Sequence, residues 1–132
     1  MTATGTFDVD LSPQEDGVTP AGRMLIDKTY QGDLAGKGLG QMISKRTDNG
    51  VAVYFAIEEF EGTLKGKSGT FTLLHNGKMS AETQSLNISV LEGSASGELI
   101  GLTGAMRIIQ QDGKHSYELD FELQSVSFNR NN

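Results

Sequence analysis

Apolar and polar residues alternate along much of the chain, which is the pattern of β-strands rather than of helices. In the clearest segment, Tyr117, Leu119, Phe121 and Leu123 alternate with acidic residues. This period of two is typical of a strand with one buried and one solvated face. The chain opens with the same pattern around Phe7, and we find no convincing stretch with the period of about 3.6 residues of an amphipathic helix. Further strands are predicted over residues 23–31, 39–46, 51–61, 69–76, 85–91 and 105–111.

Short turn signals separate several of these strands. Asp48-Asn49-Gly50, Asn76-Gly77 and Asp112-Gly113 combine residues that tolerate the positive φ of tight hairpin turns. The 17 glycines and only two prolines of the chain also favour strands and turns over helices. We therefore expect an all-β fold, a single antiparallel barrel of roughly eight strands that spans residues 1–132 as one domain. Segment 12–22, which holds both prolines, is expected to be a surface connection, a lid or an Ω-loop.

A short glycine motif recurs along the chain. The pattern G-x-L-x-G-x-x-G occurs at residues 62–69 and again at 97–104, and it begins a third time at Gly32. We interpret these copies as places where glycine permits bulges and a close approach of two backbones at barrel corners. The first copy lacks the spacing of a phosphate-binding P-loop, and a strand rather than a helix is predicted to follow it.

Composition narrows the classes of partner. The formal net charge is −6 and the basic residues are scattered, which disfavours binding to nucleic acid. The absence of cysteine excludes disulfides and thiolate metal sites. The N-terminus has neither the basic nor the apolar region of a signal peptide, and no apolar run is long enough to span a membrane. We expect a cytoplasmic protein with no cofactor and no membrane partner.

Two titratable residues stand out on the predicted strands. By alternation, Glu58 shares a face with Tyr54, and the other positions of that face are mostly small alanines that leave empty space. His75 shares a face with Phe71 on the next long strand. If both faces point inward, Glu58 and His75 could meet and transfer a proton. The alternative is a strand-end charge at Glu58 and a rim histidine before a turn.

These residues define a candidate site inside the barrel. The candidate catalytic residues are Glu58 and His75, projecting into one cavity, and the candidate ligand-binding residues are Tyr54, Phe71 and Tyr30. A buried carboxyl group at Glu58 should be protonated or hydrogen-bonded. A metal site is not expected, because His115 follows a turn and should be exposed.

Several blocks of the sequence resemble a bacterial family of uncharacterised small proteins with an allene oxide cyclase-like, calycin-like barrel. The blocks are residues 3–9, 30–36, 57–58, 61–71, 74–77 and 93–104. The resemblance implies an eight-stranded barrel with a central cavity, with Glu58 and His75 on family positions. The chain departs from the family pattern at Ile88 and Glu92, where the family has tryptophan and proline.

Three functions fit these observations. The leading one is a barrel that binds a small, largely apolar molecule in its central cavity. The first alternative is a cofactor-free isomerase or cyclase that uses Glu58 and His75. The second is a non-catalytic interaction protein: if Glu58 faces inward, then Val53, Phe55 and Ile57 face outward, and such adjacent apolar side chains usually mark an interface. We therefore also expect a homo-oligomer, and whether the protein is an enzyme stays open.

Overall fold

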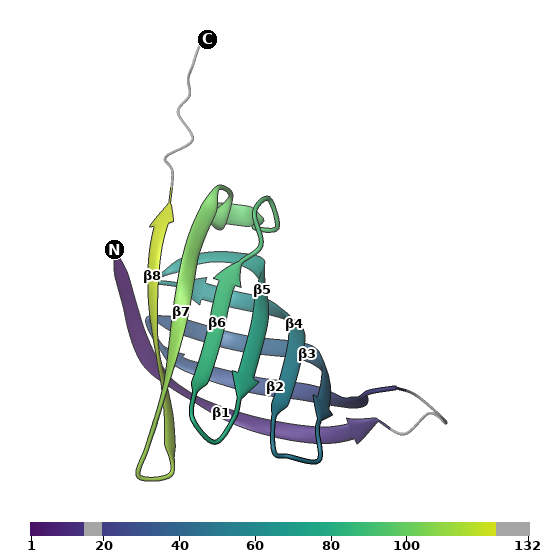
Figure 1. The fold of residues 1–132 in the computed structure, drawn as a ribbon. Helices are drawn as coiled ribbons and strands as arrows, with labels where there is room; N and C mark the ends of the chain where they lie inside the picture. The colour runs from purple at the N-terminus through teal and green to yellow at the C-terminus, as the bar shows by residue number, and fades with distance from the viewer. Residues whose placement is uncertain (15–19, 124–132) are drawn as a thin grey trace.

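The computed structural model describes residues 1–14 and 20–123, which form a closed antiparallel barrel of eight strands (Figure 1). Each strand pairs with its neighbours in sequence, and β1 pairs with β8 to close the barrel. The predicted fold is thus confirmed. The strands are β1 (Thr2–Gln14), β2 (Gly22–Gly32), β3 (Leu34–Arg46), β4 (Ala52–Leu64), β5 (Lys67–Met79), β6 (Gln84–Val90), β7 (Leu102–Gln111) and β8 (Lys114–Leu123), with a single 3₁₀ turn, η1 (Gly97–Leu99), before β7.

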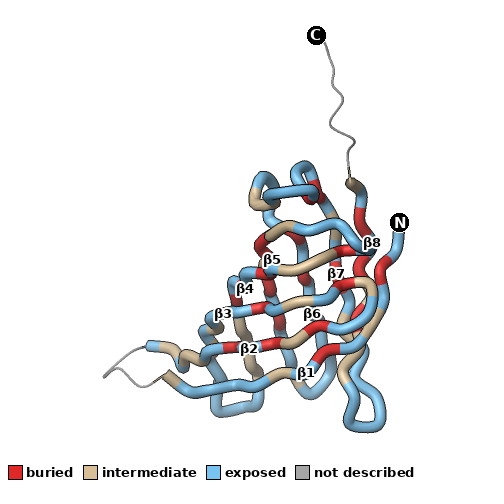
Figure 2. Tube along the Cα trace, turned by 180° about the vertical axis from the view of Figure 1, so that it is seen from behind, coloured by how far each residue is buried: buried red, intermediate tan, exposed pale blue. Residues whose placement is uncertain are grey.

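Burial follows the alternation of the sequence (Figure 2). On β4, Ala56, Glu58 and Phe60 are buried, whereas the adjacent Phe55 and Ile57 are about half exposed. The inner positions of all eight strands converge on one core, in which aromatic rings pack tilted, edge-to-face or stacked, with ring centres 4.8–5.6 Å apart. Successive residues therefore serve the core and the outer surface in turn.

One end of the barrel, which we call the closed end, is sealed by leucines. The leucines of the three glycine-motif copies, Leu34, Leu64 and Leu99, all lie there with at most 1% exposure. Gly36 and Gly62 are paired across β3 and β4, and a side chain on either would collide with the facing backbone. As predicted from the glycine motif, the backbones of β3 and β4 approach each other closely at these glycines.

At the other end, which we call the open end, the odd-numbered strands finish and the inner face is less covered. Leu11 is 53% exposed and Leu86 is 37% exposed, although both occupy inner positions by strand register. Further inner residues of this end are only partly buried: Val9, Met24, Met42, Tyr54 and Ile108. Solvent therefore reaches the inner face of the barrel from the open end.

Two turn predictions have opposite outcomes. Asp112 and Gly113 connect β7 and β8 with positive φ values of 54° and 75°, as expected for a tight hairpin turn. The turn predicted at Asn76-Gly77 is wrong, because both residues lie inside β5, which continues to Met79. Gly77 is there because the ring of Tyr54 on β4 occupies the space of a side chain.

Strand ends also differ from the prediction, most clearly at two places. The strand expected from residue 39 begins at Leu34, since the glycines at 36, 38 and 40 hide the alternation without preventing pairing. The predicted connection 12–22 is shorter than expected, because β1 continues to Gln14; its residues 15–19 lie outside the described part of the chain.

Candidate functional site

Register places the two candidate catalytic residues side by side. His75 is paired with Ala56, and Glu58 with Leu73, so Glu58 and His75 are diagonal neighbours on the inner face of β4 and β5. His75 Nε2 lies 2.8 Å from Glu58 Oε1. The strand-end position and the rim position considered as alternatives do not describe them, since Glu58 is 0% and His75 6% exposed.

Two residues of β2 complete the cluster. Lys28 Nζ donates to Glu58 Oε1 at 3.1 Å, and the Tyr30 hydroxyl donates to Glu58 Oε2 at 2.5 Å. Lys28 Nζ also lies 3.4 Å from the Tyr30 hydroxyl and 4.7 Å from the centre of the Phe7 ring. We call Lys28, Tyr30, Glu58 and His75 the buried polar cluster. Each carboxylate oxygen of Glu58 thus has at least one donor.

Glycines on β3 make this cluster possible. β3 lies between β2 and β4, so ordinary inner side chains there would separate Lys28 from Glu58. The inner positions hold Gly38 and Gly40 instead, paired with Phe60 and Glu58. A side chain on Gly38 would collide with the Glu58 carboxylate and crowd the Tyr30 ring. The missing side chains therefore let residues of β2 reach across to β4.

The partners of Glu58 decide its protonation. Burial alone would raise the pKa of Glu58, but the hydrogen bond from His75, the charge of Lys28 and the hydrogen bond from Tyr30 outweigh it and lower the pKa from 4.5 to about 2. Glu58 is therefore an ionised acceptor, and His75 Nε2 carries the proton of their hydrogen bond. Burial, the nearby negative charge of Glu58 and their hydrogen bond raise the pKa of Tyr30, which stays a neutral donor.

The three candidate ligand-binding residues separate into different environments. Tyr30 belongs to the buried polar cluster. Tyr54 is partly buried at the open end, with its ring over Gly77. Phe71 is 0% exposed and stacks on Phe60 with ring centres 4.8 Å apart, so at its level the interior is filled by side chains.

Sequence reasoning missed Lys28. The signal was present, since Lys28 alternates in phase with Ile26 and Tyr30 and thus lies on an apolar strand face. A lysine on such a face needs a buried partner. His115, expected to be exposed, is partly buried, and its ring packs 5.1 Å from the Phe7 ring.

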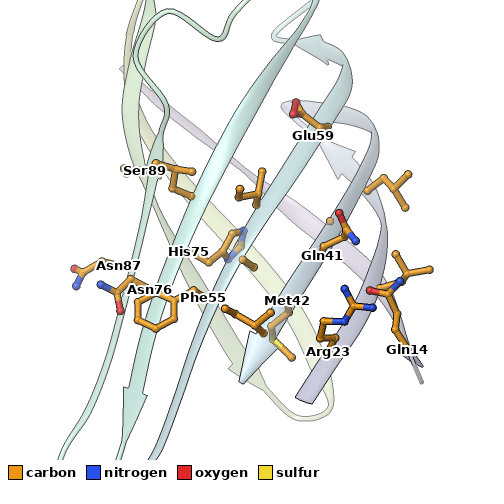
Figure 3. Close-up of a pocket in the computed structure, with 17 residues that line it drawn as sticks. Gln14, Arg23, Gln41, Met42, Phe55, Glu59, His75, Asn76, Asn87 and Ser89 are labelled. Carbon is orange, nitrogen blue, oxygen red and sulfur yellow. The ribbon is translucent and has the colours of Figure 1, made fainter. Parts of the chain in front are cut away.

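A groove lined mostly by outward residues lies on the outer face of the sheet (Figure 3). It has a volume of about 950 Å³. Most of its apolar side chains come from outward positions of β2, β3 and β4, and Leu74 of β5 adds another. The amides of Gln41, Asn76 and Asn87 also line it, as do the side chains of three inner positions, Met42, Ala56 and His75. The five exposed apolar residues, which we call the outer apolar patch, are Leu25, Leu39, Ile43, Phe55 and Ile57.

Within residues 1–14 and 20–123, no group of three or more His, Asp or Glu side chains is arranged to hold a metal ion. In the same part of the chain, no helix is long and apolar enough to cross a membrane.

Comparison with known proteins places the chain in a family. It matches the family described as "Protein of unknown function (DUF3224)" over residues 3–121. No curated protein is significantly similar to it. The fold is similar to the crystal structure of a protein of unknown function from the DUF3224 family of Shewanella oneidensis MR-1. The TM-score is 0.88 and the identity 39%, over 95% of this chain and 98% of that one. The likeness to allene oxide cyclases stays a prediction. The family match over residues 3–121 and the 39% identity show that the chain belongs to the DUF3224 family.

Proposed function

We propose that this protein binds a small, largely apolar molecule at the open end of its barrel. The observation that carries the proposal is the exposure of inner apolar side chains there: Leu11 is 53% and Leu86 37% exposed. Exposed apolar side chains of this kind are what an apolar ligand buries. We therefore propose a site at the open end rather than in the centre of the barrel, because the side chains of Phe71 and Phe60 fill the interior at their level along the barrel axis.

The buried polar cluster gives this site a floor. Lys28 and His75 retain 4% and 6% exposure, whereas Glu58 retains none, so Lys28 and His75 are the cluster residues that a ligand would contact. Because Glu58 neutralises the charge of Lys28, the floor is polar but not strongly charged. Such a floor suits a ligand with an apolar body and one hydrogen-bonding group.

Binding is favoured over proton-transfer catalysis by the state of Glu58. A carboxylate with a pKa of about 2 is a weak base near neutral pH. It also has no exposed surface on which a substrate could contact it. The cofactor-free isomerase or cyclase alternative would need Glu58 to exchange protons with a substrate, so we rank it second.

The test is a titration with Nile red, an uncharged apolar dye. We expect the wild type to bind the dye, and Leu86→Asp at the open end to weaken binding at least tenfold. Two matched controls place the same charge elsewhere: Ile109→Asp, 44% exposed on β7, and Phe55→Asp, 49% exposed in the outer apolar patch. Neither should change the affinity. Loss of binding in Phe55→Asp but not in Leu86→Asp would place the ligand outside the barrel and overturn the proposal.

A further inference from the structure

We propose that the outer apolar patch is the interface of a homodimer, in which a second copy of this chain fills the groove over β2, β3 and β4. Five of the twelve exposed large apolar side chains of the described residues gather there, with exposures between 38% and 59%. Large exposed apolar side chains concentrated at one place usually mark an interface. This inference concerns the outer face and is independent of ligand binding at the open end.

The size of the patch fits a stable dimer. Aromatic side chains bury roughly 150–250 Å² each, and at the lower end of that range five side chains that are about half exposed leave on the order of 400 Å² accessible. A standard interface buries about 800 Å² on each partner, of which a little over half is apolar. The patch supplies that apolar share, and the adjacent amides and Ser89 supply polar surface.

The charge distribution of this face is compatible with a contact between two copies. With a net charge of −6 two copies repel each other, and the repulsion is smallest where the contact surfaces carry few acidic side chains. The middle of the groove carries none, since Gln41, Ile57 and Leu74 follow each other in register across β3, β4 and β5. The acidic residue of the groove, Glu59, is engaged by the Thr72 hydroxyl at 2.6 Å.

The groove also suits a second copy in shape and in hydrogen bonding. The outer surface of a twisted barrel is a saddle, convex around the axis and concave along the strands. Two identical saddles fit when their strands cross at about 90°, one of the two common packings of sheets. A two-fold interface must complement itself, and side-chain amides do so because each carries both a donor and an acceptor. Gln41, Asn76 and Asn87 provide them (Figure 3).

Sedimentation velocity or light scattering on the full chain tests the inference. We expect the wild type to be a dimer at tens of micromolar and Ile57→Asp to weaken the dimer at least a hundredfold. Ile109→Asp, an outward position of β7 outside the groove, is the matched control and should stay dimeric. A monomeric wild type, a trimer, or dissociation by Ile109→Asp but not by Ile57→Asp would overturn the inference.

A second measurement does not depend on a disruptive charge. The chain has no cysteine, so Gln41→Cys introduces a single thiol in the middle of the groove. Near a two-fold axis the two copies of this thiol meet, and mild oxidation should link most of the protein as a disulfide dimer. Thr103→Cys on β7 is the control and should link far more slowly. Equal rates for the two variants would contradict an interface at the groove.

Discussion

The closed and open ends of the barrel use the same strands but bury different chemistry. At the closed end, leucines from β3, β4 and η1 are at most 1% exposed, and the Tyr117 hydroxyl accepts a hydrogen bond from the Leu34 N–H at 2.7 Å. Toward the open end lie the buried polar cluster and then inner side chains that solvent reaches. The closed end thus stabilises the fold through buried side chains, whereas the open end leaves inner side chains accessible to a ligand.

Removing the cation of the buried polar cluster should have the largest effect on stability. Lys28→Met keeps an aliphatic side chain but leaves the buried Glu58 carboxylate without its cationic partner, which should cost about 3–5 kcal/mol of unfolding free energy. Lys37 forms a pair of the same 3.1 Å distance with Asp27 at the surface, and Lys37→Met should cost less than about 1 kcal/mol. Urea unfolding at pH 7 measures both. Similar losses in the two variants would mean that burial of the cluster contributes nothing.

A matched leucine truncation compares the two ends directly. Leu64→Ala at the closed end creates a cavity among fully buried side chains and should cost about 2–5 kcal/mol. Leu86→Ala at the open end removes a side chain that is already 37% exposed, and should cost about 1 kcal/mol or less. Urea unfolding of the two variants provides the measurement. Equal losses would show that the open end is sealed in solution.

Acid should weaken the barrel through Glu58. Its pKa is about 2 in the folded protein and near 4.5 otherwise, so its contribution is fully present above about pH 5 and is lost as the pH falls toward 2. The expected loss is about 3 kcal/mol. The double variant Lys28→Met/Glu58→Gln lacks both charges, and the difference between its pH profile and that of the wild type isolates this contribution. Parallel profiles would contradict the low pKa.

The smallest effect is expected from a single methyl group. Gly38→Ala would push against the Glu58 carboxylate and should cost about 1–3 kcal/mol. Gly22→Ala is the control, since its new methyl group would meet Ser44 only at an ordinary contact distance of 3.4 Å. Thermal unfolding followed by circular dichroism would compare them. No loss in Gly38→Ala would mean that the cluster can shift without cost.

The sequence could predict the barrel because its strands follow one local rule, the alternation of apolar and polar residues. Alternation groups Glu58 with Ala56 on one face of β4 and Ile57 on the other, but because both faces are partly apolar it leaves open which face points inward. Alternation could not predict which side chain of a neighbouring strand occupies the space beside a glycine. Asn76-Gly77 has the composition of a turn, and only the Tyr54 ring on the next strand explains why glycine is needed inside β5.

The candidate site was predictable in part for the same reason. Glu58 and His75 lie on consecutive strands, so their proximity follows from the register of one hairpin. The approach of Lys28 to Glu58 instead depends on Gly38, a residue without a side chain on the strand between them. An inner position without a side chain gives no apolar or charged signal in the sequence.

The seam between β1 and β8 has a consequence for how the chain folds. Seven of the eight strand pairings join consecutive strands, whereas the seam pairs Thr2 with Asp120 near opposite ends of the sequence. Chain entropy opposes such a distant pairing until the rest of the sheet holds the two strands near each other. The seam should therefore close late, and its closure rather than the formation of any hairpin should set the folding rate.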